Sequence, residues 1–311
     1  MTIAFLFPGQ GSQAVCMGRA FSETSGAAKR VFEEANDALG FDLRRVMFEG
    51  PEAELALTAN TQPAVLTASV AAAAACAERG LTPALAAGHS LGEYSALVVA
   101  GALRLADAVR VVRRRGELMQ AAVPVGTGAM AAIMGVALDV VEQVCAEAAQ
   151  GEVVDVANVN SELQIVIAGH RTAVERAVAL VKERGGRKSV LLPVSAPFHC
   201  SLMAPASEGL ALELGKVTVR DPVIPVVRNV DGGVTRAAAD VVPFLLRQVA
   251  SPVRWTACVQ RLAAEGVTAF AEVGPGRVLT GLVKRIVEDA RSAAIEDPPG
   301  LDKALAALAA P

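Results

Sequence analysis

A short motif around one serine restricts the fold of this chain more than any other feature. Residues 88 to 92 read Gly-His-Ser-Leu-Gly. In a G-x-S-x-G motif the serine stands on a sharp turn between a strand and a helix, and the small flanking residues allow the tight turn. An apolar run, Leu85-Ala86-Ala87, precedes the motif, and residues 93 to 100 have a helical pattern. The motif predicts a strand, a turn that exposes Ser90, and a helix; an ordinary glycine-flanked turn is the alternative.

The composition excludes several classes of protein. The chain has 311 residues and a net charge of −3, which argues against a general nucleic-acid binder. Its 5 cysteines are scattered and form no C-x-x-C pair, so we expect neither a disulfide framework nor a metal site. Scattered cysteines suit the reducing cytoplasm, where we expect this protein to be located.

No segment of the sequence indicates export or a membrane span. The N-terminus lacks the basic and apolar regions of a secretory signal. Residues 55 to 77 carry no charge, but Asn60, Gln62 and Pro63 interrupt them. This composition favours a buried helix over a transmembrane helix. We therefore expect a soluble protein with no membrane partner.

Strands and helices alternate along most of the chain, which predicts an α/β fold with a mostly parallel sheet covered on both faces. The expected strands are 3–7, 85–87, 224–227 and 268–273. The expected helices are 20–39, 63–79, 106–121, 200–214, 241–250, 255–265 and a last one ending near 289.

Residues 126–197 have an order of their own. Strands are expected at 129–136, 153–157, 164–168 and 189–194, and helices at 138–149 and 172–184. This βαββαβ order is that of a ferredoxin-like domain. The predicted domains are therefore a discontinuous large domain of residues 1–125 and 198–292, a small inserted domain of residues 126–197, and a C-terminal tail of residues 293–311. Within this tail, we expect residues 297–310 to form a mobile linker and a short surface helix.

A serine nucleophile needs a general base, which is most often histidine. The chain has 3 histidines. His89 is adjacent to Ser90, where side chains diverge, and His170 ends a strand of the small domain. His199 lies at the junction of the two domains, where clefts form, and is the best candidate. The pattern selects no carboxylate to orient it, and a backbone carbonyl is an alternative.

Two further groups are expected near Ser90. The N–H of the residue after the nucleophile, Leu91, is an expected oxyanion donor, and the glycine-rich loop at residues 9–11 is the expected source of a second. Three successive arginines, residues 113–115, cannot share one helix face, so at least one points inward or toward a cleft. A buried arginine needs an anion, either a substrate carboxylate or an internal acid.

Seven ordered motifs make the chain resemble the malonyl-CoA:acyl carrier protein transacylases of bacterial fatty-acid synthesis. They lie between residues 3 and 290 and are FPGQGSQ at 7–13, NTQPA at 60–64, GHSLGEYSA at 88–96, RGELMQ at 115–120, GTGAM at 126–130, PFHC at 197–200 and EVGPG at 272–276. The resemblance implies an α/β-hydrolase-like large domain with an inserted ferredoxin-like domain.

The resemblance also implies roles for individual residues. Ser90 and His199 would form a catalytic dyad, with the histidine held by the main-chain carbonyl of Gln248. Arg115 would bind the free carboxylate of the malonyl group, positioned by Gln62. The backbone amides of Gln10 and Leu91 would form the oxyanion hole.

The expected activity is that of an acyltransferase, an [acyl-carrier-protein] S-malonyltransferase. A malonyl group would pass from malonyl-CoA to Ser90 and then to the phosphopantetheine thiol of acyl carrier protein, without a metal or redox cofactor. Phe198, beside His199, would leave little room for an α-methyl branch. A serine thioesterase or hydrolase, a malonyl transferase dedicated to polyketide synthesis, and a non-catalytic carrier-binding module are the alternatives. We expect a monomer.

Carrier proteins are acidic, so the docking face should be basic. Arg187 and Lys188, near the domain junction, are candidates, and a solvated surface pair is the alternative. Two positions depart from the family pattern. Ser161-Glu162-Leu163 replaces a segment that usually carries Pro-Gly, and Cys16 stands where glycine is usual.

Overall fold

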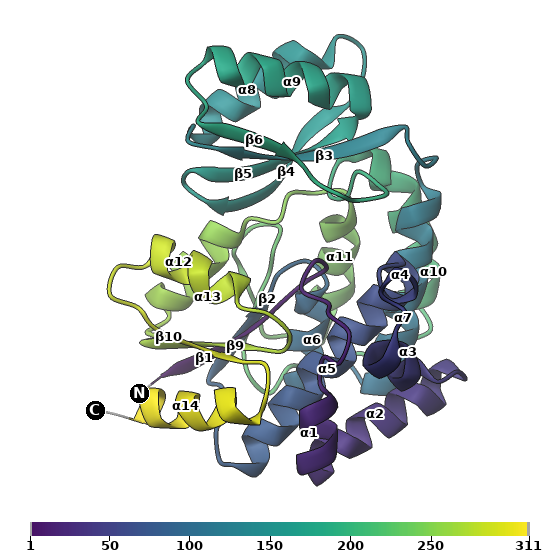
Figure 1. Ribbon diagram of the computed structural model, residues 1–311, viewed down its shortest axis with the longest axis vertical. Helices are drawn as coiled ribbons and strands as arrows, with labels where there is room; N and C mark the ends of the chain where they lie inside the picture. Colours follow the sequence, from purple (N-terminus) through teal and green to yellow (C-terminus); the bar gives the residue numbers. More distant parts are fainter. Residues whose placement is uncertain (1, 310–311) are drawn as a thin grey trace.

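The computed structural model describes residues 2–309 and contains two sheets, one in each lobe of the molecule (Figure 1). The larger sheet has the strand order β10-β9-β1-β2-β7-β8. Its strands are β1 (Ile3–Phe7), β2 (Leu85–Gly88), β7 (Val226–Val227), β8 (Val234–Thr235), β9 (Ala269–Val273) and β10 (Arg291–Ile295). All neighbouring strands are parallel except β7 and β8, which confirms the mostly parallel α/β fold.

Helices cover both faces of this sheet, because successive side chains of each strand point to opposite faces. On one face Phe5 and Phe7 pack in the large core, with helices at 26–39, 58–78, 92–99, 105–121, 204–214 and 238–249. On the other face Ala4 and Leu6 pack with helices at 255–264 and 278–286. Both cores are mainly aliphatic, as the low aromatic content of 4% predicts.

The helices of the large lobe occupy defined ranges. They are α1 (Arg19–Thr24), α2 (Gly26–Leu39), α3 (Leu43–Glu49), α4 (Glu52–Leu55), α5 (Thr58–Glu78), α6 (Gly92–Val99), α7 (Leu105–Ala121), the 3₁₀ helix η1 (Ser201–Met203), α10 (Ala204–Leu214), α11 (Ala238–Val249), α12 (Trp255–Ala264), α13 (Val278–Ile286) and α14 (Pro298–Ala309).

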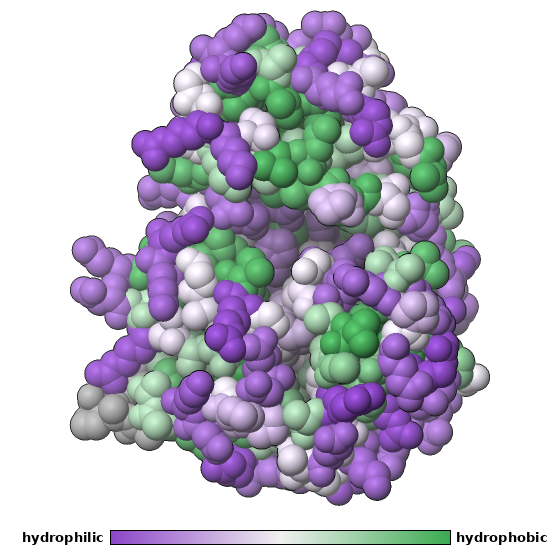
Figure 2. Space-filling view, viewed as in Figure 1, coloured by the Kyte–Doolittle hydropathy of each residue, from purple (hydrophilic) through white to green (hydrophobic). Residues whose placement is uncertain are grey.

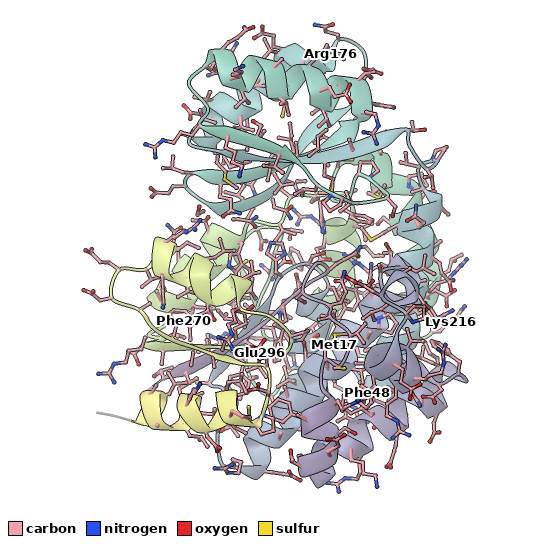
Figure 3. All side chains as sticks on the ribbon, viewed as in Figure 1. Met17, Phe48, Arg176, Lys216, Phe270 and Glu296 are labelled. Carbon is pink, nitrogen blue, oxygen red and sulfur yellow. The ribbon has the colours of Figure 1, made fainter. Side chains whose placement is uncertain are left out.

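The second sheet lies in the upper lobe of Figure 1 and has the order β4-β5-β3-β6, with every neighbouring pair antiparallel. Its elements are β3 (Gly128–Met134), α8 (Leu138–Ala149), β4 (Val154–Ser161), β5 (Gln164–His170), α9 (Arg171–Glu183) and β6 (Lys188–Leu191). The sequence of elements is the βαββαβ order of a ferredoxin-like fold. A separate apolar core lies between this sheet and its two helices. In Figure 3 Arg176 lies in this lobe, whereas Met17 and Phe270 lie in the large lobe.

Several boundaries differ from the sequence-based expectation. The helix expected at 20–39 is two helices, because Ser25 is extended and its side chain accepts a hydrogen bond from the N–H of Ala28, capping α2. Helix α5 begins at Thr58, so Pro63 lies inside it rather than near its first turn. The first turn still forms, because the N–H groups of Asn60 and Thr61 donate to Leu57 O.

The short helix expected in the C-terminal tail is present as α14, but a strand precedes it and one side of the helix is buried rather than lying on the surface. Strand β10 extends the large sheet beside β9, and α14 packs on it, with Leu301, Ala304 and Leu308 buried in the main core. The short, alanine-rich β10 has no clear alternation, and its burial comes from partners distant in sequence. Residues 310 and 311 of the predicted tail lie outside the described residues.

The uncharged segment is the buried part of α5, as expected. Within residues 2–309, no helix combines the length and the apolar character that crossing a membrane requires.

Candidate active site

The candidate site lies at the carboxyl ends of the parallel strands, where ligands bind in open α/β sheets. Phe7 and Gly88 are paired at the ends of β1 and β2, so the loops after these strands lie side by side. Gln10 follows β1, Ser90 follows β2, and Asn229 follows β7. Figure 2 shows the surface hollowed between the two lobes.

This hollow corresponds to a cleft of about 1120 Å³. Its walls come from both lobes and include Gln10, Gln62, His89, Ser90, Leu91, Arg115, Met130, Asn158, Leu192, Phe198 and His199. Seven of the ten predicted site residues are among these lining residues. The remaining three are Gln248, which lies just behind the cleft, and the exposed pair Arg187 and Lys188.

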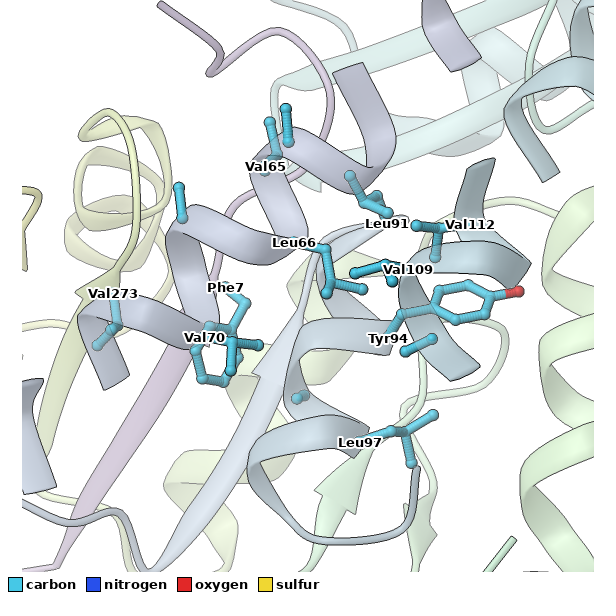
Figure 4. Close-up of a cluster of buried hydrophobic side chains, with 14 of the residues drawn as sticks. Phe7, Val65, Leu66, Val70, Leu91, Tyr94, Leu97, Val109, Val112 and Val273 are labelled. Atoms are coloured by element: carbon cyan, nitrogen blue, oxygen red, sulfur yellow. The ribbon is translucent and has the colours of Figure 1, made fainter. Parts of the chain in front are cut away.

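Ser90 stands on the sharp turn that the motif predicts. Its φ of 52° is left-handed, a conformation that non-glycine residues rarely adopt. A Cβ at Gly88 would lie 1.9 Å from Gly92 C, and a Cβ at Gly92 would lie 2.1 Å from Phe7 O. Glycine is therefore required at both flanking positions. Leu91 and Tyr94 anchor the turn by packing against Val109 and Val112 of α7 (Figure 4).

Ser90 Oγ and His199 Nε2 are 2.7 Å apart. His199 Nδ1 lies 2.9 Å from the main-chain oxygen of Gln248. A carbonyl oxygen can only accept, so Nδ1 carries the proton and Nε2 is left to accept the hydroxyl proton of Ser90. The orienting group is thus a backbone carbonyl, one of the two possibilities that sequence reasoning left open.

His199 is held in its neutral form. Burial, followed by the nearby Arg115 guanidinium, lowers the pKa of His199 to about 3. Only 4% of this residue is exposed, and its φ of 61° is also left-handed. At neutral pH the imidazole is therefore available to accept a proton.

Arg115 is the inward-pointing arginine of the three and is only 2% exposed. Its Nη2 donates to Ser90 Oγ at 3.2 Å and to Gln248 Oε1 at 3.0 Å, and its Nη1 donates to Gln62 Oε1 at 3.0 Å. Burial lowers the pKa of this guanidinium. The other two arginines of the triplet, Arg113 and Arg114, pair with Glu117 on the surface of α7.

Within residues 2–309, Arg115 has no carboxylate within 4 Å, and its Nε has no hydrogen-bond partner. The internal acid that sequence reasoning kept as an alternative is thus not in direct contact with it. A buried guanidinium held only by neutral groups can bind an anion that enters the cleft.

The glycine-rich loop is pressed against the turn that carries Ser90. A Cβ at Gly9 would lie 2.5 Å from His89 O, so only glycine permits this approach. In the part of the chain that the structure describes, the backbone N–H groups of Gln10 and Leu91 have no acceptor. Two free amides beside a nucleophile are what an oxyanion hole requires.

The other histidines have structural contacts. His89 Nε2 lies 2.9 Å from Asn160 Oδ1, and its ring lies 5.5 Å from that of Trp255, so it links the turn to the small lobe. His170 Nδ1 accepts from the N–H of Val153. Both arrangements agree with the elimination that selected His199.

Sequence reasoning missed two residues beneath the turn, Glu93 and Asn229. Asn229 Oδ1 accepts from the N–H of Ser90 at 2.7 Å. Glu93 accepts from the N–H of Asn229 and from Gln248 Nε2. The only local signal for Glu93 is its position three residues after Ser90, in the first turn of α6, where an acidic residue is also explained by the helix dipole.

Comparisons with known proteins agree with this geometry. Residues 4–298 match the model of the acyl transferase domain. The malonyl CoA-acyl carrier protein transacylase of Salmonella typhimurium is 50% identical over 303 residues, which cover 97% of this chain and 98% of that protein.

Solved structures are similarly close. The acyl-carrier-protein S-malonyltransferase of Burkholderia pseudomallei has a TM-score of 0.95 and 49% identity, covering 98% of this chain and 100% of that one. A malonyl-transacylase solved in complex with its type II PKS acyl-carrier protein has a TM-score of 0.95 and 46% identity, covering 98% of this chain and 99% of that one. The motifs, the two-lobed fold and these relatives together show that this chain belongs to the malonyl CoA-acyl carrier protein transacylase family.

Proposed function

We propose that this protein transfers a malonyl group from malonyl-CoA to the phosphopantetheine thiol of acyl carrier protein through a malonyl-Ser90 intermediate. The observation that carries this proposal is the buried guanidinium of Arg115, 3.2 Å from Ser90 Oγ and without a carboxylate partner among the described residues. A nucleophile beside such a cation suits an acyl group that has its own carboxylate.

In the first half-reaction Ser90 Oγ attacks the thioester carbonyl while His199 Nε2 takes the hydroxyl proton. The oxyanion accepts hydrogen bonds from the amides of Gln10 and Leu91. The C–S bond then breaks, and the imidazolium returns the proton to the departing CoA thiolate. The second half-reaction reverses these steps with the carrier thiol as nucleophile. The proposed sequence needs no metal or redox cofactor.

Arg115 and Gln62 are proposed to select the acyl group. A bound malonyl carboxylate would pair with the guanidinium, whereas an acetyl group would leave the buried cation without an anion. Phe198 is 8% exposed and lines the cleft next to His199. We propose that its ring disfavours an α-methyl branch on the acyl chain.

Arg115→Ala tests the proposed selection. We expect kcat/KM for malonyl transfer to fall by roughly 10²-fold or more, with little change for acetyl transfer, because an interaction with a buried charge is lost. Arg114→Ala is the matched control, since Arg114 is exposed on the same helix and pairs with Glu117. An unchanged preference for malonyl in Arg115→Ala would contradict the assignment. If the wild-type chain rapidly released free malonate from malonyl-CoA without any acceptor thiol, it would be a hydrolase instead.

The carrier protein is proposed to dock on a basic face that includes Arg187 and Lys188. Both residues are exposed. Lys188 begins β6, and the segment that follows this strand, from Leu192 to Ser195, lines the cleft. The pair therefore stands on the element that leads directly into the cleft wall.

A further inference from the structure

Glu93 is a buried carboxylate that touches the site only through other residues. It is 3% exposed, lies in the first turn of α6, and is not among the residues that line the cleft. Its Oε2 accepts two hydrogen bonds, from the main-chain N–H of Asn229 at 3.0 Å and from Gln248 Nε2 at 2.8 Å. One oxygen thus joins the segment after β7 to helix α11.

The partners of the two amide side chains fix how each amide is oriented. Asn229 Oδ1 accepts from the N–H of Ser90, and Asn229 Nδ2 donates to Gly88 O at 2.7 Å. Gln248 Oε1 accepts from Arg115 Nη2. Main-chain N–H and guanidinium groups can only donate, and carbonyl groups can only accept, so neither amide can be reversed without losing bonds.

Together the two amides clamp the backbone of Ser90. Asn229 accepts from its N–H at 2.7 Å, and Gln248 Nε2 donates to its main-chain oxygen at 3.0 Å. A non-glycine residue keeps a φ of 52° only where several contacts hold its backbone in that conformation. Holding both polar groups of the Ser90 backbone supplies this constraint.

The same Gln248 amide also holds the arginine. Its Oε1 accepts from Arg115 Nη2 at 3.0 Å while its Nε2 faces Glu93. Without an acceptor at Glu93, Gln248 Nε2 would keep only Ser90 O at 3.0 Å and Asn229 Oδ1 at 3.3 Å, and the amide that holds both Ser90 and Arg115 would be less firmly oriented. The oxygen of Glu93 therefore determines two geometries at once.

We propose that Glu93 is a positioning residue of the acyl-transfer site, whose Oε2 holds Gln248 and Asn229 so that they fix the Ser90 backbone and the Arg115 guanidinium. The part that concerns acyl selection rests on the proposed malonyl transfer, whereas the part that concerns Ser90 does not. The role requires an acceptor oxygen rather than a charge. Burial raises the pKa of Glu93 to about 7, which is consistent with this requirement.

Three substitutions distinguish an acceptor from a charge. Glu93→Gln keeps a carbonyl oxygen within reach of both donors and removes the charge. Glu93→Asp keeps the charge but withdraws the oxygens by one methylene. Glu93→Met removes the acceptor at similar size. Glu272→Met is the control, because Glu272 is 1% exposed and caps the amides of Leu279 and Thr280 in α13 instead.

Two readouts are measured on each purified chain. The first is the ratio of kcat/KM for malonyl over acetyl transfer to carrier protein. The second is the rate at which a fluorophosphonate labels Ser90, which needs no carboxylate recognition. Failure of the wild-type chain to transfer malonyl would refute the proposed function alone, since labelling of Ser90 still tests the clamp.

We expect Glu93→Met to lose about tenfold or more in both readouts, Glu93→Asp to lose less, and Glu93→Gln to remain within about threefold of the wild type. Glu272→Met should lower Tm without changing either readout. The proposal is overturned if Glu93→Asp matches the wild type while Glu93→Gln fails, or if Glu93→Met leaves both readouts unchanged. If Glu93→Met does not fold, comparing the two readouts of Glu93→Asp with those of Glu93→Gln still shows whether the role needs a charge or an acceptor oxygen.

Discussion

Ser90 and His199 face each other from two left-handed backbone positions, with φ values of 52° and 61°. The conformation of Ser90 follows from its motif, whereas that of His199 has no local signal because contacts distant in sequence impose it. Cys16 shows the same effect. The family resemblance led us to expect glycine there, and the φ of 74° at Cys16 is a conformation that glycine adopts without strain.

Individual site residues were predictable to different degrees. Only 3 histidines had to be distinguished, so elimination was sufficient for His199. The chain has 32 acidic residues, and no pattern indicates that one of them lies under the nucleophile. Glu93 and Asn229 meet only because β2 and β7 are neighbours in the sheet. Sequence periodicity does not encode that neighbour relation.

The buried imidazole makes a testable prediction about pH. The lowered pKa of His199, about 3 instead of 6.5, means that the unfolded chain binds a proton there more readily. The contribution of His199 to stability is therefore lost as pH falls from about 6.5 towards 3. Between pH 7 and pH 5 this amounts to about 2 kcal/mol of unfolding free energy.

Glu93 changes stability with pH in the opposite direction to His199. A His199→Asn variant isolates the contribution of His199, because Glu93 is present in both proteins. The raised pKa of Glu93, about 7, means that its contribution is lost as pH rises from about 4.5 through 7. We therefore predict that the stability difference, variant minus wild type, grows by about 2 kcal/mol from pH 7 to pH 5 in urea unfolding. If the unfolding free energies of the two proteins changed with pH in parallel, the pKa of His199 would not be lowered in the folded state.

At the scale of elements, the contact between α5 and α7 places two residues of the site. Gln62 lies on α5 and Arg115 on α7, and Arg115 donates to Gln62 across this contact. The helices approach closely at Gly116, where a Cβ would lie 2.7 Å from Thr58 O. The sequence predicted α7 to within one residue, but it placed the start of α5 at Pro63 and so left Gln62 outside the helix.

Gly116→Ala should force these helices apart. We predict a loss of about 1–3 kcal/mol in unfolding free energy, as for other overpacked sites, together with a higher KM for malonyl-CoA. Gly281→Ala is the matched control, since Gly281 is exposed in α13 and the added Cβ has no heavy atom within 4 Å beyond its chain neighbours and the nearby backbone of its own helix. That variant should gain up to about 1 kcal/mol. Equal stability of both variants in urea unfolding would contradict the packing argument.

At the scale of the whole molecule, the cleft lies between two lobes with separate sheets and separate cores. The alternation of elements predicted both sheets. Strand β10 and the buried face of α14 were not predicted, because β10 is ordered by pairing with β9 on the other side of α13, and α14 packs mainly on β10. Short alanine-rich segments become ordered when a sheet edge is available, and periodicity alone does not reveal that edge.

The two-lobed arrangement also separates the proposed docking face from the far end of the large lobe. We predict that Arg187→Glu combined with Lys188→Glu raises the KM for carrier protein roughly tenfold, while the KM for malonyl-CoA stays the same. Lys303→Glu is the control, because Lys303 is exposed on α14, at the opposite end of the molecule (Figure 1). Equal changes in both KM values would refute the assignment of this face.

Ser90 is proposed to carry a malonyl group between two thiols. Intact-mass spectrometry of the chain after mixing with malonyl-CoA, and again after adding phosphopantetheinylated carrier protein, tests this role. We predict a mass increase of one malonyl group that is absent in Ser90→Ala and that moves to the carrier protein in the second step. An adduct that persists in Ser90→Ala, or malonate released to water before the carrier protein is added, would exclude this role of Ser90.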